Sequence, residues 1–202
     1  MMRLPLIACL LFSVTAAAVS AQTILGDIAR REARGEAPGE IFFTRIVEVF
    51  PADFKEVARR SDVIFHGQVT PIVTQPTTDG RALFTDYSIV PTQHVLEHAK
   101  PSNRSNEAIV IRQWGGTLQM GAWTVVVEDS YMPNLKPGTD YILMLKYNDA
   151  IGRYEIAAEG LGAFLVQPGG VKRLMRGPRL NPDLAASPSD FITAIHEALT
   201  ER

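Results

Sequence analysis

The apolar residues from position 63 onward recur mainly with a period of two, which is the spacing of β-strands. In VIFHGQV, Val63, Phe65 and Val69 lie on one face, while His66 and Gln68 lie on the other. This alternation predicts a strand with one face turned toward a core. Further strands are predicted in LFTDYSIVPTQHVLEH, EAIVIRQW, TLQMGAWTVVVED, YILMLKY, RYEIAA, GAFLV and GVKRLM.

Turn segments that contain glycine and proline separate these short strands. Asp79-Gly80 lies at the centre of a predicted turn, and NLKPG and NDAIG are two more turn segments. Pro91 interrupts the second strand, which indicates a bulge or an edge position. YILMLKY is apolar on both faces and is therefore expected at the centre of a sheet. Short strands separated by such turns are typical of an all-β barrel or sandwich.

Helical periodicity is confined to the segments that flank the strands. The charged stretch after position 22 predicts a short helix over 24–34, within a loosely held arm, and a strand over 41–50 follows it. Residues 51–62 have a helical pattern, with apolar residues on one face. Near the end, Ser187 suits an N-cap and Pro188 the first helical position, so an amphipathic helix begins there.

The first residues have the three-part layout of a secretory signal. Arg3 precedes a short apolar run, and Val19-Ser20-Ala21 supplies small residues before a cleavage site near Ala21-Gln22. LIAC, ending at Cys9, resembles a lipobox, but most of the apolar run follows the cysteine, which favours a cleavable signal. We therefore expect a secreted or periplasmic protein whose mature part has no membrane span.

The predicted organisation follows from these segments. It comprises a signal peptide at 1–21, an N-terminal extension at 22–52, a β-barrel domain at 53–175, and a linker with a C-terminal amphipathic helix at 176–202.

Composition narrows the classes of partner. Cys9 is the only cysteine and lies within the predicted signal, so the mature chain is expected to fold without a disulfide. Loss of Arg3 with the signal takes the formal net charge from −2 to −3. A mildly acidic chain has no general attraction for nucleic acid, and none is expected as a partner. The one basic cluster, Lys172, Arg173, Arg176 and Arg179, is interpreted as a solvated linker, with a polyanion site as the alternative.

His94-Val95-Leu96-Glu97-His98 is the sharpest catalytic motif. It fits H-x-x-E-H, in which two histidines one helical turn apart hold zinc and the glutamate acts as a base. On a strand, however, the Cα atoms of His94 and His98 would lie about 13 Å apart, too far to share an ion. The preceding Pro91 favours the strand, so we expect no metal or other cofactor, and a zinc-dependent hydrolase remains the alternative.

A second candidate site lies in IVIRQWGG, where Arg112 and Trp114 share a strand face and a glycine pair follows. An arginine beside a tryptophan is able to stack a base or a sugar. A glycine pair after a strand more often marks a corner, where backbone bends too sharply for other residues. We interpret the segment as a corner and keep Arg112 and Trp114 as candidate ligand-binding residues.

The order of these segments also resembles a known group. SDVIFHGQV, a long strand ending in VLEH, IVIRQWGG, LKPGTDYILMLKYNDAIGRYEI and GLGAFLV are similar to uncharacterised bacterial secreted proteins with a netrin/TIMP-like OB-fold. The resemblance covers residues 53–166 and implies a mainly β, OB-like barrel of five to seven strands, with flanking N- and C-terminal helices. The animal members inhibit metalloproteases through an N-terminal cysteine, which the mature chain here lacks.

Together these features predict a non-catalytic binding or interaction module that acts on an unknown extracytoplasmic protein or small ligand. Two alternatives stay open. One is a zinc-dependent hydrolase built on His94 and His98. The other is an anion- or glycan-binding barrel that uses Arg112, Trp114, Lys172 and Arg173.

Overall fold

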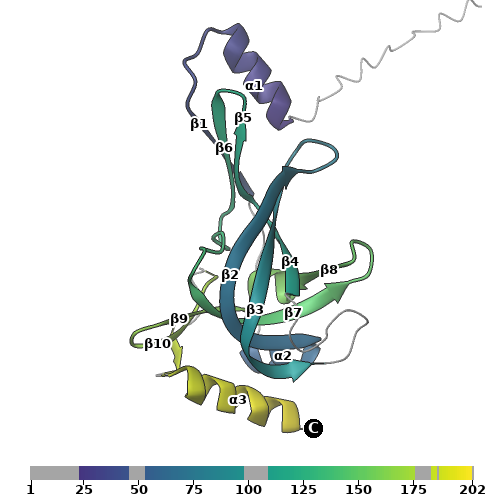
Figure 1. Ribbon diagram of the computed structural model, residues 1–202, viewed down its shortest axis with the longest axis vertical. Coiled ribbons are helices and arrows are strands. Elements are labelled where there is room, and N and C mark those ends of the chain that lie inside the picture. Colours follow the sequence, from purple (N-terminus) through teal and green to yellow (C-terminus); the bar gives the residue numbers. More distant parts are fainter. Residues whose placement is uncertain (1–22, 46–52, 98–108, 176–182, 186, 202) are drawn as a thin grey trace, which may run out of the picture.

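The computed structural model describes residues 23–45, 53–97, 109–175, 183–185 and 187–201. This part of the chain is mainly β and forms an elongated molecule, with α1 at one end and α2 and α3 at the other (Figure 1). The helices are α1 (Ile24–Ala33), α2 (Phe54–Arg60) and α3 (Pro188–Thr200). The strands are β1 (Glu40–Arg45), β2 (Val63–Pro76), β3 (Leu83–Glu97), β4 (Ile109–Trp114), β5 (Gly116–Met120), β6 (Trp123–Asp129), β7 (Asp140–Asn148), β8 (Arg153–Ile156), β9 (Ala163–Gln167), β10 (Gly170–Arg173) and β11 (Asp183–Ala185).

Five strands form a closed ring of hydrogen-bonded neighbours. β2 pairs with β3 and β7, β3 pairs with β4, and β7 pairs with β8, all antiparallel. The ring closes where β4 and β8 run parallel, with Ile111 opposite Tyr154. β9 pairs with β7 on the edge opposite β2, and β10 and β11 continue the sheet from β9. The central position predicted for YILMLKY is confirmed, since β7 pairs with three strands.

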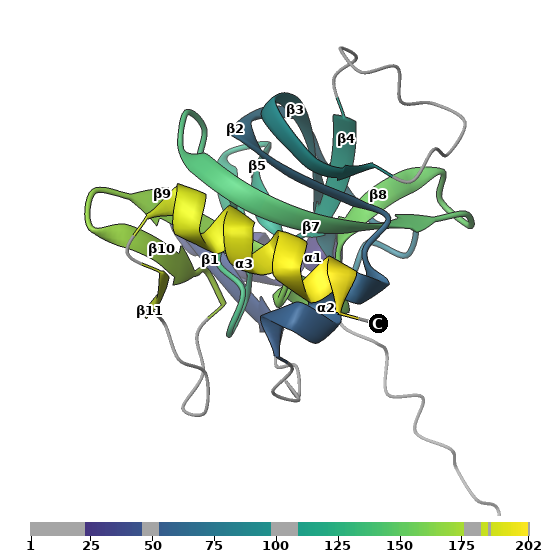
Figure 2. The same cartoon turned by 90° about the horizontal axis from the view of Figure 1, so that it is seen from below.

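The main hydrophobic core lies between this ring and the two helices at its end. Phe65, Ile111 and Leu143 are completely buried in it. The Phe191 ring of α3 packs between those of Phe54 and Phe164, with centroid distances of 5.2 and 4.8 Å. Figure 2 shows α3 lying across this end of the sheet beside α2. The predicted cap is also present, because the Ser187 hydroxyl accepts a hydrogen bond from the Asp190 N–H at 3.1 Å.

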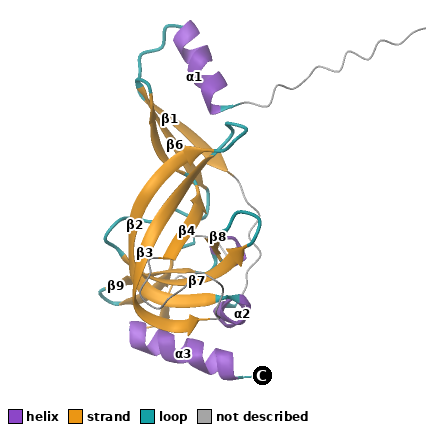
Figure 3. Cartoon of the chain, turned by 45° about the vertical axis from the view of Figure 1, so that its right-hand side comes forward, coloured by secondary structure: helices purple, strands orange, loops and turns teal. Residues whose placement is uncertain are grey.

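A second sheet, in the order β1-β6-β5, carries the other end of the molecule. Figure 3 shows β1 and β6 at that end, next to α1. α1 packs on it and is not the loosely held arm that its charged sequence suggested. Ile24 and Ile28 are buried with Trp123 in a separate core, and the Trp123 indole N–H donates to Glu32 at 3.3 Å. The Ile24 N–H donates to the Gly80 carbonyl in the β2–β3 turn at 2.8 Å. Sequence reasoning missed these contacts because they join residues far apart in the chain.

The corner predicted after IVIRQW is confirmed. β4 ends at Trp114, and β5 begins at Gly116 in the second sheet. Gly115 and Gly116 have φ values of +101° and +140°, which disfavour other residues. A Cβ atom on Gly115 would also lie 2.7 Å from the Val127 carbonyl oxygen. The chain therefore passes between the two sheets through a step that only glycine fits.

Several predicted segments extend beyond the described residues. The strand expected over 41–50 is described only as far as Arg45, and residues 176–182 and 186 of the expected linker lie outside the description. Within that linker, β11 pairs with β10 and so adds a strand that the sequence pattern did not predict. The bulge expected at Pro91 is confirmed by a register shift between His66 and Gly67, its partner in β2. In the part of the chain that is described, no helix has both the length and the apolar character needed to span a membrane.

Candidate ligand pocket beside β4 and β8

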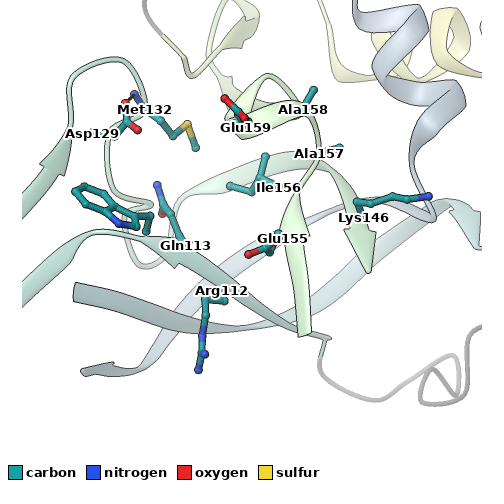
Figure 4. A pocket seen from close by; sticks show the side chains of 12 residues that line it. Arg112, Gln113, Asp129, Met132, Lys146, Glu155, Ile156, Ala157, Ala158 and Glu159 are labelled. Carbon is teal, nitrogen blue, oxygen red and sulfur yellow. Dashed lines mark hydrogen bonds between the residues drawn. The ribbon is translucent and has the colours of Figure 1, made fainter. Parts of the chain in front are cut away.

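A pocket of about 390 Å³ lies beside β4 and the end of β8. Its volume falls within the range of about 300–1,000 Å³ that is usual for small-molecule sites. Figure 4 shows the side chains that surround it. The lining residues come from β4, β6, β7, β8 and the segments after β6 and β8: Arg112, Gln113, Trp114, Asp129, Met132, Lys146, Glu155, Ile156, Ala157, Ala158, Glu159 and Gly160.

β4 contributes side chains from both of its faces to the pocket. Ile109, Ile111 and Gln113 are buried, whereas Arg112 and Trp114 on the other face are partly exposed. The Gln113 amide is held at both ends, because its Nε2 donates to the Pro133 carbonyl at 3.0 Å and its Oε1 accepts from the Leu135 N–H at 3.1 Å. Gln113 therefore fixes the segment after β6 against β4 and gives this side of the pocket a rigid wall.

Arg112 lines the pocket, but its charge is directed elsewhere. Its Nε and Nη2 donate to the two carboxylate oxygens of Asp86, both at 2.8 Å, in a bidentate ion pair. The Asp86 hydrogen bonds raise the pKa of Arg112, and the field of the nearby Glu155 carboxylate acts in the same direction. In Figure 4 the guanidinium points away from Glu159 and Asp129. The structure therefore does not present Arg112 as a free cation for an anionic ligand.

The segment after β8 has an unusual backbone where it borders the pocket. Ala158 and Glu159 have φ values of +52° and +55°, and Gly160 follows at +103°. Left-handed conformations of non-glycine residues cost about 1–3 kcal/mol each and persist only where the surroundings impose them. Here the surroundings include Arg173, whose Nη1 donates to the Leu161 carbonyl at 3.2 Å. The rim of the pocket is thus held in a defined shape.

Three carboxylates join the lining from different elements. Asp129, at the end of β6, accepts hydrogen bonds from the Tyr131 and Met132 N–H groups at 2.9 and 3.2 Å. Glu155 in β8 accepts from the Asn148 side chain at 2.9 Å. Glu159 belongs to the left-handed segment and is exposed.

The second cation of the lining, Lys146, is also engaged. Its Nζ lies 2.9 Å from an Asp62 carboxylate oxygen. Asp62 itself is buried and also accepts a hydrogen bond from the Tyr147 N–H at 2.9 Å. Figure 4 shows the Lys146 ammonium pointing away from Glu155. Lys146 therefore contributes mainly its alkyl chain to the pocket.

The structure brings together only two of the four residues predicted to bind a ligand. Arg112 and Trp114 share the pocket, whereas Lys172 and Arg173 lie in β10 and are not part of the lining. The strand predicted in GVKRLM is confirmed for Lys172 and Arg173, whereas their interpretation as part of a solvated linker is wrong for Arg173, which is 9% exposed. Burial lowers the pKa of Arg173, and its guanidinium lies 5.4 Å from the centroid of the Phe164 ring. Arg176 and Arg179 lie outside the described residues.

The H-x-x-E-H segment is extended over the part that can be described. His94 and Glu97 belong to β3, which confirms the strand and leaves no helical turn between 94 and 97. His98 lies outside the described residues. Among the described residues, no three His, Cys, Asp or Glu side chains are grouped so as to hold a metal ion.

The sequence analysis did not identify Asp129, Glu155 or Glu159 as site residues. The AEG segment at 158–160 carries a weak signal, since only its glycine is a residue type that adopts left-handed conformations routinely. The comparisons with known proteins add no further candidates: no protein-family model matches the chain, and no match was found among curated proteins. The functional argument therefore rests on the geometry of the pocket.

Proposed function

We propose that the protein is a secreted or periplasmic, non-catalytic binding module that takes a small ligand into the pocket beside β4 and β8. The pocket itself carries this proposal, since it combines a ligand-sized volume with a rim held in a strained conformation. The ion pair of Arg112 with Asp86 and the two hydrogen bonds of the Gln113 side-chain amide make its walls rigid. A preformed pocket of this kind loses little entropy when a ligand binds.

The proposal includes an OB-like barrel as the scaffold. The ring β2-β3-β4-β8-β7 has five strands. β8 lies between β4 and β7 in space, although it follows β7 along the chain. This arrangement supports a five-stranded Greek-key barrel, the architecture of OB-folds, which serve mainly as binding scaffolds. A relationship to the netrin/TIMP-like group is proposed on the sequence resemblance alone.

Neither alternative function gains support from the pocket. A zinc-dependent hydrolase needs His94 and His98 one helical turn apart, whereas His94 lies in an extended strand. An anion-binding site needs an available cation, and the cationic groups of Arg112 and Lys146 each pair with a carboxylate.

The test is a titration of residues 22–202 with small fragments of neutral, anionic and cationic type, followed by nuclear magnetic resonance. We expect shifts of the Trp114 indole N–H and of the amides of 155–160 for at least one fragment. Ala158→Trp, which fills the pocket from its exposed rim, should abolish these shifts. Ala150→Trp, a matched change in the exposed β7–β8 turn, should preserve them. If no fragment of any charge perturbs the pocket, the proposed function is wrong.

Localisation has a separate test. Expression of the full chain in a bacterial host with fractionation should place the protein outside the cytoplasm, and its intact mass should correspond to a chain that begins at Gln22. A full-length mass in the cytoplasmic fraction would contradict the proposed export.

A further inference from the structure

The charges around the pocket do not balance. Both cations of the lining are already paired with carboxylates that do not line it, Arg112 with Asp86 and Lys146 with Asp62. Three further carboxylates, Asp129, Glu155 and Glu159, belong to the lining. Arg173, which supports the rim through the Leu161 carbonyl, adds a third cation, so the pocket and its immediate supports hold five carboxylates against three cations and carry a net charge of −2.

An aromatic wall accompanies these carboxylates. Trp114 lines the pocket from the end of β4, where the glycine corner fixes the direction of the strand. Tryptophan is the side chain whose ring face attracts cations most strongly, by about 0.5–2 kcal/mol depending on solvent exposure. Aliphatic surface from Ile156, Ala157 and Met132 completes the lining. An aromatic ring, aliphatic surface and carboxylates together suit a cation that carries apolar groups.

The spacing of the acidic side chains decides between a metal ion and a larger cation. Asp129, Glu155 and Glu159 come from three elements and, among the described residues, are not grouped closely enough to coordinate one metal ion. In Figure 4 Asp129 lies on one side of the pocket and Glu155 on the other. A volume of about 390 Å³ also far exceeds that of a single ion. An organic cation can lie between the carboxylates without contacting all of them.

We propose that this pocket selects organic cations, such as a quaternary ammonium or alkylated amine group, with Trp114 as the aromatic wall and Glu155, Glu159 and Asp129 as the source of negative potential. This inference rests on the proposed function and names its ligand class. The ligand charge is opposite to that of the anion-binding alternative, which the sequence left open for Arg112 and Trp114.

The test uses three compounds of nearly the same shape. Choline carries a trimethylammonium group, 3,3-dimethylbutan-1-ol is its neutral isostere, and 3,3-dimethylbutanoate is a related anion. Residues 22–202 are titrated with each by calorimetry and nuclear magnetic resonance at low salt. We expect choline to bind at least about tenfold more tightly than the neutral isostere, and the anion to bind least. The affinity for choline should fall as salt screens the carboxylates.

Variants then assign the effect to the pocket. Glu159→Gln should weaken choline binding about two- to fourfold without changing that of the neutral isostere, because an exposed carboxylate contributes modestly. Trp114→Leu should remove most of the discrimination between the two compounds. Glu128→Gln is the matched control, since Glu128 is an exposed carboxylate beside Asp129 that does not line the pocket. Should Trp114→Leu fail to fold, the comparison of Glu159→Gln with Glu128→Gln still decides.

The outcomes separate the inference from the proposed function. Preference for choline that falls in Glu159→Gln and not in Glu128→Gln supports the cation site. Equal binding of choline and its isostere, tightest binding of the anion, or choline shifts that lie outside the pocket overturn it. So does the failure of all three compounds to shift the pocket amides. The proposed function fails only if the wider fragment titration also leaves those amides unchanged.

Discussion

At the scale of single residues, the most consequential contact is the ion pair of Arg112 with Asp86, which no local sequence pattern predicts. Arg112 and Asp86 are 26 positions apart and become neighbours only because β3 and β4 pair in the observed register. Asp86 is 6% exposed, so its charge depends on the guanidinium for compensation. The pattern IVIRQWGG correctly predicted a corner and a shared face for Arg112 and Trp114. It did not reveal that the Arg112 guanidinium is already paired with the Asp86 carboxylate.

Replacement of Arg112 by methionine should therefore destabilise the protein. We expect a loss of about 3 kcal/mol in the free energy of unfolding, because a buried carboxylate is left without its partner. Asp86→Asn in the same chain should recover part of this loss, since it removes the uncompensated charge. Urea denaturation of the wild type, both single variants and the double variant measures the coupling. A loss below about 1 kcal/mol for Arg112→Met would contradict the assigned role.

Tyr87 gives the fold a pH dependence in the alkaline range. It is 3% exposed, and burial raises its pKa from 10.0 to about 12. The folded state therefore favours the protonated phenol. The resulting stability is fully present below pH 10 and is lost as pH rises toward 12, where the unfolded chain ionises first. Two pKa units correspond to roughly 3 kcal/mol.

We expect Tyr87→Phe to flatten the decline in unfolding free energy between pH 10 and 12 relative to the wild type. Chemical denaturation at a series of pH values provides the measurement. Tyr131→Phe is the control, since Tyr131 is only partly buried at the surface of the core. Parallel curves for the wild type and Tyr87→Phe would show that Tyr87 does not ionise differently in the two states.

At the scale of elements, sequence periodicity located the helices and most strands but not their partners. α3 begins at its expected cap because capping and the apolar stripe are local properties. The parallel pairings of β1 with β6 and of β4 with β8 have no local signal. The β4–β8 pairing brings Glu155 to the pocket that Trp114 also lines, so the pocket could not be assembled from sequence. The charged helix α1 was expected to be loose because its contacts with Trp123 and with the β2–β3 turn also have no local signal in the sequence.

The docking of α3 depends on one aromatic side chain. Phe191 is 1% exposed and contacts the rings of Phe54 and Phe164. Phe191→Ala should lower the free energy of unfolding by about 3–5 kcal/mol, through lost burial and a residual cavity. Thr193→Ala, on the exposed face of the same helix, should change it by less than about 0.5 kcal/mol. Thermal and urea unfolding of the two variants compares them directly. Similar small losses in both would mean that α3 is not anchored through its aromatic face.

At the scale of the whole molecule, the described residues pack into two separate hydrophobic cores. The larger lies within the five-stranded ring and its helices, and the smaller joins α1 to the sheet β1-β6-β5. The glycine corner between β4 and β5 connects them, and Trp114 packs against the smaller core while lining the pocket. Since the smaller core holds few buried side chains, local opening should be easier there than in the ring.

Ile28→Ala tests whether the two cores open independently. Ile28 is 7% exposed and packs only in the smaller core, so the change should destabilise it by about 2–4 kcal/mol. In native-state hydrogen exchange we expect faster exchange for the amides of α1, β1 and β6, with those of β7 unchanged. Ile142→Ala, in β7, is the matched control, and it should accelerate exchange in the ring. Equal acceleration of both groups by Ile28→Ala would mean that the cores open as one unit. In that case Trp114 would couple ligand binding to the stability of the whole molecule, and binding should then slow exchange in α1 as well as in the ring.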